Sequence, residues 1–208
     1  HKSISLLPLA AAVLLAGCSL SPAEKVERAE TAMAAGDFGA AKLDLISALE
    51  EQPGDDRLLL LLARTQLELG DGEGALQSLD RLGQKTPAIR ILRGEAELVR
   101  GNAASARDAV SGLDTAEARR IEALSALASG TIAEAERLFE AGLVAPGPKA
   151  RLLAEYARFE LARGDRRLAR DLIERAKLED ADALEVMVAD GQIHAAQGRP
   201  ADALAAFE

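Results

Sequence analysis

The stretch RLLAEYARFELARGDRRLARDLI, residues 151–173, carries the pattern that decides the fold. Strong helix formers such as Leu and Ala surround a central glycine, Gly164. Glycine favours the left-handed backbone that ends many helices, and Asp165 can cap a following helix through its side-chain oxygen. The small residues Ala157 and Ala169 stand on either side and allow close approach of two helices. The stretch therefore predicts a helix–turn–helix unit.

The same pattern recurs along the chain. Six glycines mark it, at intervals of 34, 31, 29, 34 and 34 residues: Gly36, Gly70, Gly101, Gly130, Gly164 and Gly198. Seven residues before them stand Ala29, Ala63, Gly94, Ala123, Ala157 and Gly191. Five residues after them stand Ala41, Ala75, Ala106, Ala135, Ala169 and Ala203, and nine after them Leu45, Leu79, Val110, Phe139, Ile173 and Phe207. A unit of this kind cannot bury its apolar face alone, so the repeats must stack.

The register predicts where each helix lies. First helices are expected near 24–35, 56–69, 88–100, 116–129, 149–163 and 183–197. Second helices are expected near 38–51, 72–84, 103–113, 132–143, 166–178 and from 200 onward. The residues after the first five glycines, expected to cap the second helices, are Asp37, Asp71, Asn102, Thr131 and Asp165. The shorter intervals of the third and fourth repeats are attributed to residues lost between repeats.

These columns resemble the tetratricopeptide repeat (TPR) family, over residues 23–208. Pro53 and Pro87 occupy a further position of its consensus, although the usual Trp and Tyr of the first helix are missing. The resemblance implies an all-α, right-handed superhelical solenoid of antiparallel helix pairs, with about six repeats. It also implies a concave peptide groove, whose residues carry over as Arg57, Leu60, Arg64, Leu67, Ile91, Glu95, Leu98, Arg120, Leu124, Arg151, Arg158 and Leu161.

Composition narrows the function. Hydrophobic residues make up 49% of the 208 residues, only 2% are aromatic, and the net charge is −9. This charge disfavours binding to nucleic acid. The chain has two histidines, His1 and His194, and the pattern of its residues contains no catalytic motif or metal-ligand spacing. We expect no enzyme activity, no cofactor and no metal.

The N-terminus has the features of a targeting sequence. Residues 4–16 are apolar but too few to span a bilayer, as in the core of a signal peptide. The sequence Leu15-Ala16-Gly17-Cys18 resembles the bacterial lipobox, in which the cysteine receives the lipid. We therefore expect a signal peptide over residues 1–17, lipidation of Cys18 and a tether over residues 18–22. Ser19 favours the outer membrane, with the protein facing the periplasm.

Three functions are consistent with these features. The first is a membrane-anchored periplasmic scaffold that binds proteins in envelope assembly or export, similar to repeat lipoproteins of such systems, the exosortase-associated type among them. The second is the docking arm of a larger enzyme with its catalytic domain beyond residue 208. The third is a soluble chaperone-like binder. Arginines beside leucines suit an acidic peptide; alternatively, they pair with neighbouring glutamates on a solvated face.

Overall fold

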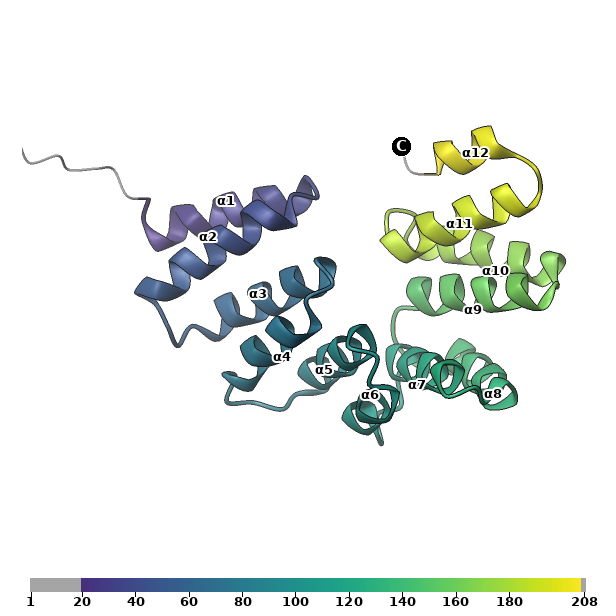
Figure 1. Cartoon of the computed structure of the whole chain (residues 1–208), viewed down its shortest axis with the longest axis horizontal. Helices are drawn as coiled ribbons and strands as arrows, with labels where there is room; N and C mark the ends of the chain where they lie inside the picture. The colour runs from purple at the N-terminus through teal and green to yellow at the C-terminus, as the bar shows by residue number, and fades with distance from the viewer. Residues whose placement is uncertain (1–19, 207–208) are drawn as a thin grey trace, which may run out of the picture.

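The computed structural model describes residues 20–206, which form twelve α-helices and no strand. The first helices of the six pairs are α1 (Pro22–Ala34), α3 (Asp56–Glu68), α5 (Pro87–Val99), α7 (Ala116–Ala128), α9 (Ala150–Arg163) and α11 (Leu184–Ala196). Their partners are α2 (Phe38–Glu51), α4 (Gly72–Asp80), α6 (Ala103–Val110), α8 (Ile132–Val144), α10 (Arg166–Glu179) and α12 (Pro200–Ala205). Figure 1 shows the pairs stacked into a curved arch. The predicted right-handed solenoid of helix pairs is confirmed.

The turns within the pairs form as the sequence predicts, with two exceptions at the caps. All six repeat glycines have positive φ angles, from 71° at Gly70 to 92° at Gly164, a region that other residues rarely adopt. Three aspartates cap the second helices through their carboxylates: Asp37, Asp71 and Asp165. The predicted caps by Asn102 and Thr131 are wrong, because their side chains donate elsewhere, to Glu97 and to the carbonyl of Ala126.

The first helix begins earlier than expected. Ser21 and Glu24 form a capping box, in which each side chain accepts a hydrogen bond from the other residue's backbone N–H. Pro22 follows at the first helical position, where its missing N–H costs nothing. The helical fold therefore includes the last residue of the expected tether.

The short intervals come from short second helices in the second and third pairs, and not from residues lost between repeats or from the fourth pair. α4 ends at Asp80 and α6 at Val110, against expected ends at 84 and 113. Arg93 of α5 donates to the carbonyl of Leu79 at 3.0 Å, and Arg90 of the same helix donates to the carbonyl of Ala109 at 2.9 Å. Side chains of α5 thus donate to carbonyls near the ends of both short helices, where few backbone N–H groups remain to do so.

The regular spacing of small and large residues builds the core. Ala29, Ala63, Ala123 and Ala157 are fully buried, as are the alanines of the second helices up to Ala169. The large apolar column from Leu45 to Ile173 is at most 1% exposed. Ala203 is half-buried, since α12 has a helix neighbour on one side only, and Phe207 lies outside the described residues.

The aromatic side chains gather in one place. Phe139 of α8 stacks on Tyr156 of α9, with ring centroids 5.0 Å apart and planes at 3°, and Phe159 lies 5.5 Å from Phe139. Burial of this cluster raises the pKa of Tyr156 to about 12, with nearby glutamates adding to the effect. The cluster fixes how the fourth repeat packs on the fifth.

Within residues 20–206, every helix is too short or too polar to cross a bilayer. The expected signal peptide and the lipobox residues Leu15, Ala16, Gly17 and Cys18 lie outside the described residues.

Candidate functional site

The first helices line the inside of the arch. The first helices contact one another from repeat to repeat: α3 contacts α5, α5 contacts α7, α7 contacts α9, and α9 contacts α11. Second helices of neighbouring repeats contact one another far less. Elements on the inside of a curve lie closer together than those on the outside. The inner surface is therefore made by α3, α5, α7, α9 and α11, which carry most of the predicted groove residues. We call this surface the concave face.

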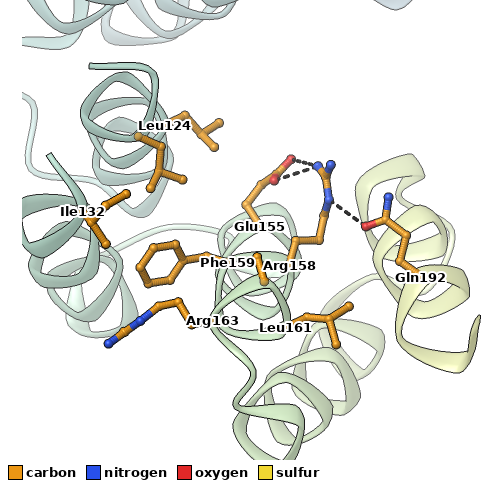
Figure 2. A pocket seen from close by; sticks show the side chains of 10 residues that line it. Leu124, Ile132, Glu155, Arg158, Phe159, Leu161, Arg163 and Gln192 are labelled. Carbon is orange, nitrogen blue, oxygen red and sulfur yellow. Dashed lines mark hydrogen bonds and ion pairs between the residues drawn. The ribbon is translucent and has the colours of Figure 1, made fainter. Parts of the chain in front are cut away.

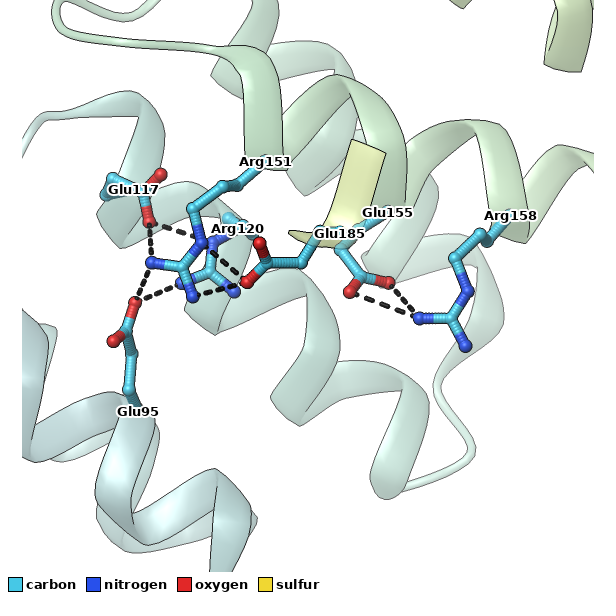
Figure 3. A network of polar contacts seen from close by, with 7 residues as sticks. All are labelled: Glu95, Glu117, Arg120, Arg151, Glu155, Arg158 and Glu185. Carbon is cyan, nitrogen blue, oxygen red and sulfur yellow. Dashed lines mark hydrogen bonds and ion pairs between the residues drawn. The ribbon is translucent and has the colours of Figure 1, made fainter. Parts of the chain in front are cut away.

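A network of ion pairs occupies the middle of the concave face (Figure 3). Arg120 of α7 is only 3% exposed; it pairs with Glu95 and, at 2.8 Å, with Glu117. Arg151 of α9 also pairs with Glu95, and its Nε donates to Glu185 of α11 at 2.7 Å. Two guanidinium groups are thus held among three carboxylates, which come from α5, α7 and α11.

The network favours the charged form of its members. Burial lowers the pKa of Arg151, but the carboxylates of Glu95, Glu117 and Glu185 outweigh it, so the pKa lies above its ordinary value. Burial raises the pKa of Glu185, but Arg151, a backbone hydrogen bond and Arg120 together lower it by more, which leaves the pKa below its ordinary value. Arg151 and Glu185 therefore stay ionised near neutral pH, and the ion pairs of the network hold its side chains in place.

The other arginines predicted for the groove differ in their contacts. Arg158 pairs with Glu155 at 2.9 Å and donates to Gln192 at 3.1 Å. Arg57 pairs with Glu30 of the preceding repeat. Among residues 20–206, Arg64 makes no ion pair. Pairing with neighbouring glutamates, the alternative interpretation of these arginines, is what the structure shows for all but Arg64.

Of the acidic partners in the network, sequence reasoning named Glu95 and missed Glu117 and Glu185. Glu117 and Glu185 stand six residues before the small residues Ala123 and Gly191, the register that Arg57 and Arg151 also occupy. The same register therefore alternates in charge along the solenoid. A search of each repeat position for acidic as well as basic residues could have found Glu117 and Glu185.

An apolar groove opens at one end of the concave face (Figure 2). It has a volume of about 880 Å³ and lies between α7, the start of α8, α9 and α11. The predicted residues Leu124, Arg158 and Leu161 line it, together with Ile132 and Phe159, which the sequence did not suggest. Ile132 is 48% exposed, so apolar surface is available there to another molecule. We call this cavity the apolar groove.

A second cavity of about 470 Å³ lies between the first three repeats, the start of α9 and the start of α11. It is bordered by the predicted residues Arg64, Leu67, Glu95 and Arg151, and by the segment 182–185 that leads into α11. Segments far apart in the sequence thus border one space. We call this cavity the inner hollow.

The remaining predicted residues are structural in their contacts. Leu60 packs against the N-terminal core cluster, and Ile91 and Leu98 pack against the small cluster of the third repeat. His194 lies 3.4 Å from Asp190 on the same helix. In the part of the chain that the structure describes, no three His, Cys, Asp or Glu side chains converge as metal ligands would.

Comparison with known proteins gives the fold a family context. Residues 32–98 match the family model described as tetratricopeptide repeat. A thermophilic TPR protein from Thermus thermophilus superposes with a TM-score of 0.67 at 20% identity, over 85% of this chain and 99% of that one. A search of curated protein sequences finds no match.

Two further solved structures share the arrangement. PilW, a type IV pilus biogenesis factor, gives a TM-score of 0.58 at 18% identity, over 89% of this chain and 90% of that one. A chain of the APC/C hetero-tetramer Cut9–Hcn1 gives a TM-score of 0.63 at 13% identity, over 90% of this chain and 39% of that one. At these identities the likeness concerns the fold. The whole chain thus has a TPR-like helical solenoid fold, and the match to the family model covers residues 32–98.

Proposed function

We propose that this chain is a scaffold that binds protein partners through its concave face. The observation that carries the proposal is the apolar groove: about 880 Å³ of open space lined by Leu124, Ile132, Phe159 and Leu161. Apolar surface of this kind, rimmed by the polar side chains of Glu155 and Arg158, suits an extended or helical peptide segment.

We further propose that a lipid on Cys18 anchors the scaffold at the outer membrane, facing the periplasm, for envelope assembly or export. Two features support this. The sequence Leu15-Ala16-Gly17-Cys18 resembles a lipobox, and the first helix begins at Pro22, so the fold would stand close to the membrane surface. PilW, a protein of similar fold, is a pilus biogenesis factor.

The proposal is tested by crosslinking in the native bacterium, followed by purification and mass spectrometry. Ile132→Arg places a charge in the apolar groove. Val144→Arg makes the same kind of change on the same helix, α8, at a side chain that is 87% exposed and outside the groove. We expect a reproducible envelope partner that Ile132→Arg loses and Val144→Arg retains. Equal recovery by both variants would contradict binding in the groove.

The anchor is tested separately. Cys18→Ala removes the thiol that would carry the lipid, and leaves the described fold unchanged because Cys18 precedes it. We expect the wild-type chain to incorporate labelled palmitate and to fractionate with membranes, and the variant to do neither. Membrane fractionation of the variant at the wild-type level would contradict the lipid anchor.

A further inference from the structure

Among the charged side chains of the inner hollow that make no ion pair within residues 20–206, the two carboxylates of Glu68 and Asp182 outnumber the one guanidinium group, that of Arg64. Four carboxylates and two guanidinium groups border the inner hollow: Glu68, Glu95, Asp182, Glu185, Arg64 and Arg151. Arg151 is already engaged by carboxylates of the ion-pair network. Within residues 20–206, neither the carboxylate of Glu68 nor that of Asp182 has an ion-pair partner.

The environment of Glu68 favours an incoming cation. Desolvation raises the pKa of Glu68, and the nearby carboxylates of Glu185 and Glu95 raise it further, against a smaller opposing effect of Arg151. A cation placed beside Glu68 would offset this repulsion. An added carboxylate would increase it, which disfavours an acidic occupant.

Apolar side chains form the rest of the wall of the inner hollow. Met33 and Phe38 border it on the side of the first repeat, Leu67 and Leu92 on the next two, and Leu184 at the start of α11. A long aliphatic side chain with a charged end, such as Lys or Arg, can place its stem along such walls and its charge beside the carboxylates.

The inner hollow and the apolar groove both adjoin α9. Arg151 borders the hollow and Arg158 borders the groove, and the two lie on the same face of the helix, seven residues apart. At about 1.5 Å per residue this is about 10 Å. An extended segment covers that distance in about three residues.

We infer that the segment taken by the concave face is basic and apolar, with a Lys or Arg in the inner hollow and an aliphatic or aromatic side chain in the apolar groove, about three residues away. This inference rests on the proposed function, whose partner it narrows. It replaces the acidic peptide that the arginines suggest from the sequence, because all of those arginines except Arg64 are paired with glutamates of the same chain.

The test is selection of random dodecapeptides, displayed on phage, against the immobilised chain. We expect enrichment of Lys or Arg about three positions from Leu, Ile, Met or Phe. A synthetic, fluorescently labelled peptide of the enriched sequence then measures affinity by polarisation. Glu68→Lys should weaken binding at least tenfold and Glu68→Gln by a smaller factor. Glu140→Lys, the same charge change at an exposed residue of α8 outside both cavities, should leave it within twofold.

The outcomes separate this inference from the proposed function. Peptides enriched in Asp or Glu, or without enriched charge, that lose binding on Ile132→Arg would overturn the inference and leave the scaffold intact. Basic peptides that bind Glu68→Lys as well as wild type would also overturn the inference. Selection of no peptide, or of peptides indifferent to Ile132→Arg, would overturn both. Circular dichroism of each variant confirms that it is folded.

Discussion

Arg151 of α9 and Glu185 of α11 are 34 residues apart in the sequence and are joined by a hydrogen bond of 2.7 Å between neighbouring repeats. Arg57 reaches back to Glu30 in the same way, from the second repeat to the first. Helix packing brings the repeats together, and these ion pairs fix how neighbouring repeats are aligned on the concave face. The ion pairs therefore hold the shape of the surface on which binding is proposed.

The buried pair is expected to contribute most to stability. Arg120→Met removes a guanidinium that is 3% exposed and leaves Glu95 and Glu117 short of a partner. Breaking a buried ion pair on one side costs about 3 kcal/mol. The matched control is Arg57→Met, where both partners are exposed and the loss is about 0.5 kcal/mol or less. Urea denaturation measures the stability of both variants. Equal losses of stability would contradict a buried ion pair at Arg120.

A second prediction concerns close packing at the start of α4. A Cβ on Gly72 would lie 2.6 Å from the carbonyl oxygen of Ala96 on α5, closer than real contacts allow. We expect Gly72→Ala to destabilise the fold by about 2 kcal/mol.

The control for Gly72 is another glycine near the start of a second helix. A Cβ on Gly39 would meet nothing closer than 3.6 Å, so Gly39→Ala should stabilise the fold by about 0.5 kcal/mol. Thermal unfolding of the two variants should shift in opposite directions. A stabilising Gly72→Ala would show that α4 and α5 are not packed this closely.

The pH dependence of stability gives a third prediction, at Asp71. A hydrogen bond from Lys42 and another from the backbone of Gly74 lower the pKa of this cap residue. A lowered pKa in the folded state adds stability above the ordinary aspartate pKa, and this stability is lost as the pH falls through the folded value. Asp71→Asn keeps the cap and removes the charge.

The expected result for Asp71→Asn is a loss of about 0.5 kcal/mol at pH 7 that becomes smaller toward pH 3. Asp71→Ala should cost about 1 kcal/mol at pH 7, because the cap is lost as well. Urea denaturation at the two pH values distinguishes these effects. A difference between wild type and Asp71→Asn that grows toward pH 3 would contradict the lowered pKa.

Much of the fold follows from the sequence, because the repeat depends on local requirements. A glycine at a left-handed turn and small residues where helices cross constrain each unit, so most helix ends fall within two residues of their expected positions. The ends of α4 and α6 do not, because arginines from another helix supply their last hydrogen bonds. These hydrogen bonds depend on tertiary packing, which the local sequence of α4 and α6 does not contain.

The site was predictable only in part for the same reason. Leu124, Arg158 and Leu161 meet in the apolar groove as their register implies, but Ile132 joins them from a second helix and Phe159 from a neighbouring face of α9. Whether an arginine is free or paired depends on which carboxylate the next repeat brings to it. Arg120 has the pattern of a solvated groove residue and is buried.

The central claim, that partners bind on the concave face, is tested most directly by photo-crosslinking from single positions in cells. A photoreactive residue at Gln192 stands beside the apolar groove, and one at Glu140 stands exposed on α8 away from it. We predict a discrete adduct of defined mass from position 192 and none from position 140. Adducts of equal yield from both positions, or from position 140 alone, would contradict the account.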